Sequence, residues 1–579
     1  MIKVSQAYKQ ASESSERKSY VVAKYGLYNK KAKFQIESVT SEYKPFSNIN
    51  KLYNDITNTN YNYISCEPNR CKLDGTFYFV NDKTKVNERE KIAYWSNAMS
   101  TENAFFQFSP KITFKFNEPI ENTEITLSFQ EAPKNFKVSF YLESYIVGGY
   151  TFRNNTSLVV ETKDSFYGGK THFDTIQITF NSTNEPYRYI KMNEIDLGVV
   201  QKFTNEQIAD FQIIDELSID SSELSANFLS LSIKNLNGEY DILNPNNKLG
   251  TLQEKQEITL YHYLKVGERY QELPLGTFLI KRFSPKKQVL EIEAYDDTYY
   301  MNQMYYGSKF YRDVEIKVIL EDLFNYFNYT NYTIDDELDG IKLTGYVPQI
   351  EWREALRLIC EAGCCVASKT REGKTYIYKT YDPSVKKFTK KLLFNEEPTK
   401  NLFNNVIDIV EYNYTNVEEN VEIYSSELDV GVQTIIYSNY PIEQESVVKS
   451  DETNANYEII ERYATSCVVN VISKTNVVLK GTLIKETSSV IRINKSQSSE
   501  NEDYAIDKVD NKLITTNISK QIANWKLGRK EVRFNFNTLV VPYIEVGDTC
   551  VYETKYGDFE FIPTRIEFTK SILQNIEGE

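Results

Sequence analysis

Hydrophobic residues alternate with polar residues along much of the chain, and this period of two is typical of β-strands that bury one face. The alternation is clearest in five short runs, KITFKF, EITLSF, FKVSFYL, SLVVET and TIQITFN, which turn residues separate. In the first run Ile112, Phe114 and Phe116 share one face. Such a ladder predicts an antiparallel sandwich of jelly-roll type over residues 41–190, with one face exposed to solvent.

Residues 191–300 contain further strand candidates at spacings of 10–20 residues, separated by Asn, Gly and Pro. They are QIADFQIIDELS, LSANFLSLSIKN, QEITLYHYL, PLGTFLIKRFSP and KQVLEIEAYDD. We expect them to form a small barrel. Residues 1–40 read as a polar, helical arm followed by two strands, and residues 401–579 read as strands interrupted by one helix at about residues 520–529.

The period changes to that of a helix between residues 301 and 400. One apolar face comprises Ile316, Ile319, Leu320, Leu323, Phe324 and Phe327, with Asp313 as the expected N-cap. A second helix over residues 351–362 places Trp352, Ala355, Leu356, Ile359 and Ala362 on one stripe and is expected to end at Gly363 in the left-handed conformation. A hairpin, CCVASK-TREGK-TYIYK, completes a predicted α+β module.

The predicted fold class is therefore mainly β, with several domains, an inserted sandwich and one small α+β module. The predicted divisions are 1–40 (arm and first strands of a barrel), 41–190 (sandwich), 191–300 (first barrel), 301–400 (α+β module) and 401–579 (second barrel and C-terminal strands). A chain of 579 residues is long enough for about three to five such domains. Its 44 Tyr and 32 Phe favour half-buried β surfaces.

The net charge of −14 repels phosphate backbones, so we expect no direct binding to nucleic acid. No apolar run approaches the length of a membrane span, and the polar first 18 residues lack the apolar core of a secretory signal. We therefore expect synthesis in a cytoplasm and no membrane-spanning segment.

The sequence contains few combinations of residues that could form a catalytic site. Its two histidines are His172 and His262, and the second lies within a strand between two tyrosines. Asp296 and Asp297 are adjacent at a strand end, where neighbouring side chains point to opposite faces, so we expect a solvated loop rather than a pair of glycosidase acids. Neither phosphate-binding nor metallopeptidase motifs occur. We predict that the chain is not an enzyme and carries no cofactor.

The seven cysteines are too few for a disulfide scaffold. Two groups stand out, Cys66 with Cys71, and Cys360 with Cys364 and Cys365. A zinc site needs four suitably spaced ligands, and both histidines lie far from these groups in sequence, so we predict no metal. The alternative reading is buried thiols or one disulfide.

The predicted sandwich offers one candidate ligand site. Tyr94, Trp95, Phe166 and Tyr167 combine aromatic rings with nearby Gly and polar residues, a mixture that stacks on sugar rings and hydrogen-bonds their hydroxyls. We interpret them as candidate carbohydrate-binding residues. The alternative is that these rings fill the sandwich core or a subunit contact.

From about residue 185 to residue 579 the sequence resembles the hub proteins of phage tails and of phage-tail-like contractile bacteriocins. The residues that carry the resemblance are Asn237-Gly238 at a turn, Asn244-Pro245 at a corner, the strand Ile258 to Leu264, Gly276-Thr277-Phe278 at the start of the next strand, and the strand Leu290 to Asp296. The segments VEIKVILEDLF to TYIYK and LVVPYIEVGD to NIEGE resemble the hub's α+β module and its final barrel strands. The sandwich resembles a jelly-roll module inserted in some hubs of Gram-positive phages.

The resemblance implies a baseplate hub: a homotrimer whose paired barrels match a hexameric tail tube on one side and a trimeric spike or tip on the other. It implies tape measure and wedge or distal tail proteins as further partners, a place in the virion tail or tail-like particle, and assembly in the host bacterial cytoplasm. The alternatives are a tip-located module that binds cell-wall glycan and, with less support, a tail-associated cell-wall hydrolase.

Overall fold

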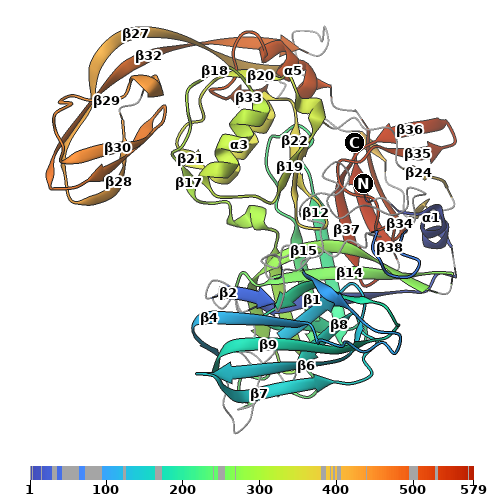
Figure 1. Ribbon diagram of the computed structural model, residues 1–579. Helices are drawn as coiled ribbons and strands as arrows, with labels where there is room; N and C mark the ends of the chain where they lie inside the picture. Colours follow the sequence, from blue (N-terminus) through green and yellow to red (C-terminus); the bar gives the residue numbers. More distant parts are fainter. Residues whose placement is uncertain are drawn as a thin grey trace. The chain divides into compact units, whose positions relative to one another are not determined.

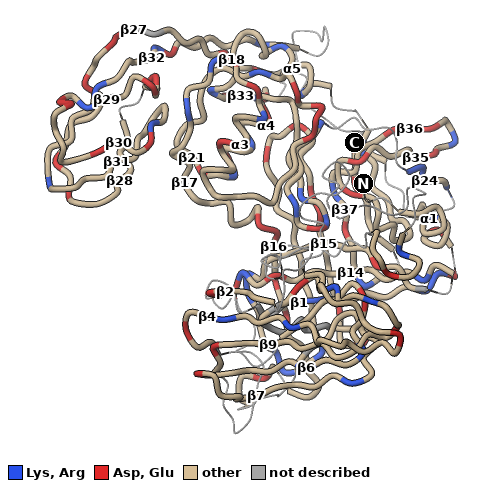
Figure 2. Tube along the Cα trace, in the orientation of Figure 1, with Lys and Arg blue, Asp and Glu red and all other residues tan. Residues whose placement is uncertain are grey.

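The computed structural model describes residues 2, 4–14, 16–28, 36–41, 52, 64–71, 94–121, 125–162, 172–238, 240–244, 254–267, 269–379, 386–390, 393–394, 398–400, 406–437, 440–494, 506–528, 532–571 and 573–579. The chain forms two compact units, which we call unit 1 (Met1–Lys24 with Phe203–Glu579) and unit 2 (Tyr25–Lys202). Acidic and basic residues are interspersed along both units (Figure 2). None of the helices in the described residues has the length and apolar character that a bilayer span requires.

Unit 2 is a β-sandwich (Figure 1). One sheet has the order β2 (Ile36–Ser41), β4 (Lys111–Glu121), β9 (His172–Thr183), β6 (Pro133–Leu142), β7 (Tyr145–Phe152). The other has the order β3 (Tyr94–Met99), β10 (Tyr189–Asp196), β5 (Ile125–Phe129), β8 (Val159–Thr162). Ile112, Phe114 and Phe116 are buried in the core between the sheets, which confirms the face predicted from their alternation.

Unit 1 is built on a large, mainly antiparallel sheet. Within unit 1 the strand order is β1 (Ser19–Tyr28, of which residues 19–24 lie in this unit), β14 (Glu257–Val266), β15 (Arg269–Pro285), β16 (Val289–Tyr295), β13 (Phe228–Lys234), β12 (Ile208–Glu216), β37 (Pro563–Thr569), β38 (Leu573–Gly578), β34 (Val532–Leu539) and β25 (Leu393–Phe394), and β26 (Thr399–Lys400) also pairs with β34. Strand β11 (Gly198–Phe203) spans the boundary between the two units in the sequence. Strand β12 pairs with β13 on one side and with β37 on the other. The sheet therefore joins strands that the sequence separates by more than 300 residues.

One face of this sheet is buried and the other is half exposed. In β13, Leu229, Leu231 and Ile233 are buried, whereas Ser230 and Ser232 are partly exposed. The alternation is the one expected for a strand with one wet face. These strands and those of unit 2 confirm that the protein is mainly β.

The α+β module holds two helices, α3 (Ile316–Tyr326) and α4 (Trp352–Ala362), whose apolar faces share one core. Its other elements are η5 (Asp297–Tyr300), β17 (Met304–Tyr305), β18 (Tyr311–Glu315), β19 (Tyr332–Ile334), η6 (Asp336–Leu338), β20 (Lys342–Gly345), β21 (Ile350–Glu351), β22 (Val366–Lys369) and β23 (Thr375–Tyr378). Both predicted helices and the hairpin β22–β23 are confirmed. The predicted N-cap is wrong, because Glu315 holds that position and Asp313 instead lies 3.1 Å from the Lys342 ammonium.

The end of α4 also differs from the prediction. Gly363 has right-handed backbone angles, and the left-handed residue is Cys364, with a φ of 51°. A Cβ at position 363 would lie 2.1 Å from Cδ1 of Ile316 at the start of α3, so any larger residue would force the buried Ile316 side chain to move. The glycine therefore serves the packing of the two helices rather than the left-handed turn.

A long two-stranded ribbon, β27 (Val406–Leu428) with β32 (Thr475–Asn494), carries a small β-module (Figure 1). That module comprises β28 (Gly431–Ile436), η7 (Gln444–Ser446), β29 (Val448–Lys449), β30 (Tyr457–Arg462) and β31 (Ser466–Val471), around a core of its own. The remaining elements of unit 1 are α1 (Gln6–Glu13), β24 (Lys386–Phe388), β33 (Ile506–Asp510), α5 (Ser519–Leu527), β35 (Cys550–Thr554) and β36 (Gly557–Phe561). The helix predicted near residues 520–529 is thus confirmed as α5.

Candidate functional site

The tip of the β22–β23 hairpin, residues 370–374, lies against the large sheet of unit 1. The turn is closed by hydrogen bonds from the Thr370 amide to the Lys374 carbonyl (2.9 Å) and from the Gly373 amide to the Thr370 carbonyl (2.8 Å). Gly373 has a φ of 82°, a conformation that favours glycine. The turn sends Arg371 into the interior, where its side chain is only 3% exposed.

Arg371 connects the hairpin to four separate segments of unit 1. Its Nη2 donates to the Ile544 carbonyl (2.5 Å) and lies 3.5 Å from Oδ2 of Asp215 in β12. Its guanidinium lies 4.5 Å from the ring centre of Phe568 in β37. Its carbonyl accepts a hydrogen bond from the Thr277 hydroxyl of β15 (3.2 Å). One side chain therefore ties the α+β module to the sheet strands before and after it.

Asp215 is the acidic partner in this junction and is 5% exposed. Burial raises the pKa of Asp215 to about 7, and it outweighs the opposing effect of Arg371. The carboxylates of Glu545 and Asp296 act in the same direction as burial. Asp215 therefore titrates near neutral pH while enclosed beside a guanidinium.

A second buried network joins the same hairpin to the end of β16. Lys369 donates to the Tyr329 hydroxyl (2.8 Å) and the Thr375 hydroxyl (2.6 Å) and forms an ion pair with Asp297. Burial lowers the pKa of Lys369, but Asp297 and Tyr329 outweigh this and raise that pKa above its ordinary value.

The expectation of a solvated loop at Asp296 and Asp297 is wrong. Asp296 is buried: its carboxylate accepts from the amides of Asn227 (2.8 Å) and Thr298 (2.9 Å) and caps η5. Burial raises the pKa of Asp296 to about 6. The two carboxylates face different partners, as their adjacency predicted, but both serve to join the module to the sheet rather than to meet solvent.

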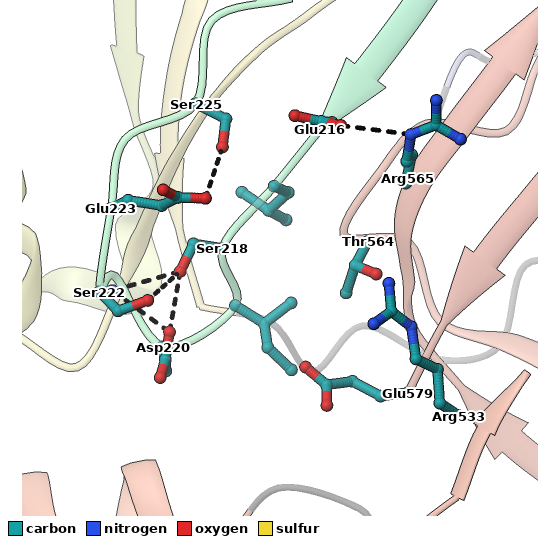
Figure 3. Close-up of a pocket in the computed structure, with 12 residues that line it drawn as sticks. Glu216, Ser218, Asp220, Ser222, Glu223, Ser225, Arg533, Thr564, Arg565 and Glu579 are labelled. Atoms are coloured by element: carbon teal, nitrogen blue, oxygen red, sulfur yellow. Dashed lines mark hydrogen bonds and ion pairs between the residues drawn. The ribbon is translucent and has the colours of Figure 1, made fainter. Parts of the chain in front are cut away.

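On the outer side of β12, a polar cleft of about 290 Å³ opens between the loop that follows β12 and strands β34 and β37 (Figure 3). Its lining residues are Glu216, Leu217, Ser218, Ile219, Asp220, Ser222, Glu223, Ser225, Arg533, Thr564, Arg565 and Glu579. Arg565 pairs with Glu216 (3.2 Å) and Glu567 (2.8 Å), and Arg533 pairs with Glu577 (2.6 Å). Both guanidiniums are thus already matched by carboxylates.

Basic side chains from two helices hold the loop that lines this cleft. Arg357 of α4 donates to the Ser221 carbonyl (3.0 Å), and Lys526 of α5 donates to the Asp220 carbonyl (2.9 Å). Lys526 also pairs with the buried Glu361 of α4 (2.9 Å). The cleft is therefore part of a rigid junction where the sheet, α4 and α5 meet.

The junction has no arrangement suited to nucleophilic catalysis in the residues described. The cleft lining includes serines and carboxylates but neither histidine nor cysteine. His262 lies buried in β14, where burial first, and then Arg17 and Arg371, lower its pKa to about 4. His172 lies at the start of β9 in unit 2. The chemistry of the junction is that of charge pairing and hydrogen bonding.

Two of the four candidate sugar-binding residues lie within the described part of the chain. Tyr94 and Trp95 are buried in unit 2, 1% and 3% exposed, and Tyr94 packs in the sandwich core. Phe166 and Tyr167 lie outside the described residues. Stacking on a sugar needs an exposed ring face, which neither Tyr94 nor Trp95 presents here. A carbohydrate site at these residues stays a prediction.

The cysteines fall into two environments. Cys66 and Cys71 are free and exposed, and Cys360, Cys364 and Cys365 are free and buried in the core of the α+β module. Burial raises the pKa of Cys364 to about 12, so that thiol is protonated at neutral pH. In the part of the chain described, no group of three or more potential ligands has the geometry of a metal site.

The sequence interpretation missed Asp215, Lys369 and Arg371. The signal for Asp215 was present: it follows Phe211 and Ile213 on the apolar face of an alternating strand, where a charged residue requires a buried partner. Nothing local indicated which residue that partner would be, because Arg371 lies in a turn of a different module.

Asp215 gives a testable pH dependence. Because its pKa is raised from 3.8 to about 7, the folded state holds a proton that the unfolded state releases, so its contribution to stability is present below about pH 4 and is lost as the pH rises through 7. From pH 5 to pH 8, the unfolding free energy of the wild type should fall by on the order of 2–3 kcal/mol relative to that of Asp215→Asn, because the asparagine side chain does not titrate. Urea unfolding of both proteins at the two pH values measures this difference. A constant difference would contradict the assignment.

Comparison with known proteins gives structural matches only. No protein-family model matches the chain, and no curated protein matches its sequence. Among solved structures, the chain is similar to the 43 kDa tail protein of prophage MuSo2 from Shewanella oneidensis, with 10% identity, 66% of this chain and 95% of that chain covered, and a TM-score of 0.37. A tail protein from Neisseria meningitidis matches with 8% identity, coverage of 65% and 93%, and a TM-score of 0.37. Prophage tail protein gp18 from Listeria monocytogenes matches with 8% identity, coverage of 66% and 91%, and a TM-score of 0.35. All three of these solved structures are described as tail proteins.

Proposed function

We propose that this chain is a structural subunit of a phage-type tail, the baseplate hub that joins the tail tube to the spike or tip, and that it is not an enzyme. The observation that carries the proposal is the large sheet of unit 1. Strands β13 to β16 come from one segment that resembles hub proteins and strands β37 and β38 from another, and the module with α3 and α4, the third such segment, lies between them in the chain.

The turns of these segments have the geometry that the resemblance requires. Gly238 of the Asn-Gly turn has a φ of 66°, and Gly547 of the VGD segment has a φ of 87°. The Gly547 amide donates to the Pro563 carbonyl (2.9 Å) at the start of β37. A Cβ at Gly547 would lie 1.9 Å from the Tyr378 hydroxyl, so glycine is needed for the close approach as well as for the turn. Both glycines hold turns that the resemblance expects at these positions, which supports the hub architecture.

An exposed apolar turn supports a role in assembly. Leu236, Ile242 and Leu243 lie on one turn after β13 and are 72–87% exposed. The turn is held by hydrogen bonds from the Tyr240 amide to Asn235 (3.0 Å) and from the Asn244 side chain to the Gly238 carbonyl (2.8 Å). An ordered turn that presents several large apolar side chains to solvent is typical of a protein contact.

The proposed assembly is a homotrimeric ring with a tail tube protein above it, a spike or tip protein below it, and tape measure and wedge or distal tail proteins as neighbours. Its proposed location is the virion tail or a tail-like particle put together in the host bacterial cytoplasm. In such a ring the apolar turn would be covered by a neighbouring copy.

A mass measurement tests this assembly. We expect the purified chain to give three times its 67.4 kDa mass by light scattering or native mass spectrometry at micromolar concentration. A stable monomer at high concentration would contradict the proposal.

A surface variant tests whether the apolar turn lies in the contact between copies. Leu243→Glu should fold normally, because the side chain is 87% exposed, and should weaken trimer formation at least tenfold by placing a charge in the contact. Val430→Glu, at an exposed apolar position beside the ribbon module, is the matched control and should leave the mass unchanged. Equal behaviour of the two variants would remove the apolar turn from the contact between copies.

A further inference from the structure

Three buried hydrogen-bonding side chains from different segments gather in the interior of unit 1. Tyr8 comes from α1, His262 from β14 and Arg371 from the tip of the β22–β23 hairpin, and each is at least 96% buried. Helix α1 packs against β14, and the Tyr8 ring meets the Tyr543 ring edge-on at 6.4 Å. Arg371 donates to the carbonyl of Ile544, the residue next to Tyr543, and its own carbonyl accepts from Thr277 of β15, the strand paired with β14, so the three segments meet in one region.

Several polar atoms of these side chains lack a partner. Within the described residues, the Tyr8 hydroxyl, Nδ1 of His262, and Nε and Nη1 of Arg371 are enclosed and form no hydrogen bond. Buried polar groups in folded proteins almost always have a partner, which is either protein, water or a bound ligand. The Tyr8 hydroxyl and the two arginine nitrogens are donors, and Nδ1 of His262 donates in the tautomer that carries its proton there, so the group indicates an occupant that accepts hydrogen bonds.

The charges around this region favour an anion. Arg17 contributes a second guanidinium, which donates to the carbonyls of Ser12 (3.2 Å) and Val540 (3.0 Å) and whose field reaches Tyr8 and His262. On the acidic side are Asp215, 3.5 Å from Arg371, and Glu545, which accepts from the Arg371 amide (3.1 Å). Burial raises the pKa of Asp215 to about 7 and that of Asp296, whose charge also acts on Asp215, to about 6, so in slightly acid solution the two guanidiniums outnumber the ionised carboxylates.

We propose that the region between Tyr8, His262 and Arg371 binds a small inorganic anion of the size of chloride. A halide accepts several N–H and O–H donors without directional preference, which suits donors from three different segments. An ordered water is the alternative occupant, but water does not compensate the buried positive charge. Because the bound anion would stabilise the protonated form of Asp215, binding should take up a proton and strengthen as the pH falls.

Thermal unfolding of the full chain tests this proposal. At pH 6 and constant ionic strength, sodium chloride is titrated against sodium gluconate, whose bulky organic anion serves as the reference. We expect the unfolding temperature to rise with chloride and to saturate, as it does when a ligand binds the folded state alone. The rise should be smaller at pH 8. A parallel titration with phosphate separates a halide site from a general oxyanion site.

A pair of hydroxyl deletions separates binding at this region from general salt effects. Tyr8→Phe removes one donor and should weaken the chloride response at least tenfold in midpoint concentration, while leaving the protein at least as stable as wild type in gluconate. Tyr20→Phe is the matched control: Tyr20 stacks on Tyr263 at 4.8 Å, and Tyr263 points to the face of β14 opposite His262. It should keep the wild-type response. Equal responses in both variants would overturn the proposal.

Crystals soaked in sodium bromide give a direct readout. An anomalous peak between Tyr8, His262 and Arg371 that is absent in Tyr8→Phe is the expected result. Density for ordered water only, with no anomalous signal in bromide, would overturn the proposal even if the unfolding temperature responds to salt.

Discussion

Replacing Arg371 with Met should destabilise unit 1 by roughly 3–5 kcal/mol at pH 8, because the substitution leaves the buried Asp215 carboxylate without its opposite charge. Methionine keeps an unbranched apolar stem but lacks the guanidinium that lies over Phe568, so the loss reports on the ion pair, the hydrogen bond and this cation–π contact together. Urea unfolding followed by circular dichroism measures the change.

Two further variants distinguish this mechanism from general sensitivity to arginine loss. Arg533→Met removes an ion pair with Glu577 on the outer face, where the arginine side chain is 46% exposed, and should cost no more than about 1 kcal/mol. The double variant Arg371→Met with Asp215→Asn should recover part of the loss, because no buried carboxylate then remains unpaired. A double variant no more stable than Arg371→Met alone would contradict the pairing.

Replacing Leu323 with Asp should unfold the α+β module, at a cost of more than about 4 kcal/mol, because the side chain is fully buried in α3 and the carboxylate would find no partner there. Trp352 of α4 stacks on Phe327 at the end of α3, at 4.5 Å, so its fluorescence reports on this core. Urea titration followed by tryptophan fluorescence is the measurement.

Val318 provides a control on the same helix. Its side chain is 44% exposed, so Val318→Asp should change the unfolding free energy by no more than about 0.5 kcal/mol. If Leu323→Asp were tolerated as well as Val318→Asp, the assignment of the buried face of α3 would be wrong.

Local pattern predicted the elements well where one face is buried. The run Ile112, Phe114, Phe116 and the helical face of Ile319 and Leu323 are both buried as their periods indicated. A side chain's face depends on its own strand or helix geometry, which neighbouring residues determine. The same reasoning failed at Asp313 and Gly363, because a cap depends on how the adjoining strand and helix pack.

The candidate site depended on contacts that no local pattern contains. Asp215 and Arg371 are separated by 156 positions, and Asp296 is buried only because the loop before β13 covers it through the Asn227 amide. For the aromatic candidates the sequence left open a sugar site, the sandwich core or a subunit contact, and the structure places Tyr94 in that core.

The sequence by itself determined that the protein is mainly β, where most strands and the two helices of the α+β module lie, and which side chains each element buries, since these follow from periods of two and 3.6 residues. Only the tertiary structure decided that β12 pairs with β37, and that the hairpin tip carries Arg371 into the sheet interior. Strand pairing and the compensation of buried charges both involve residues that are far apart in the sequence. These interactions therefore form only when the tertiary structure brings the separate segments together.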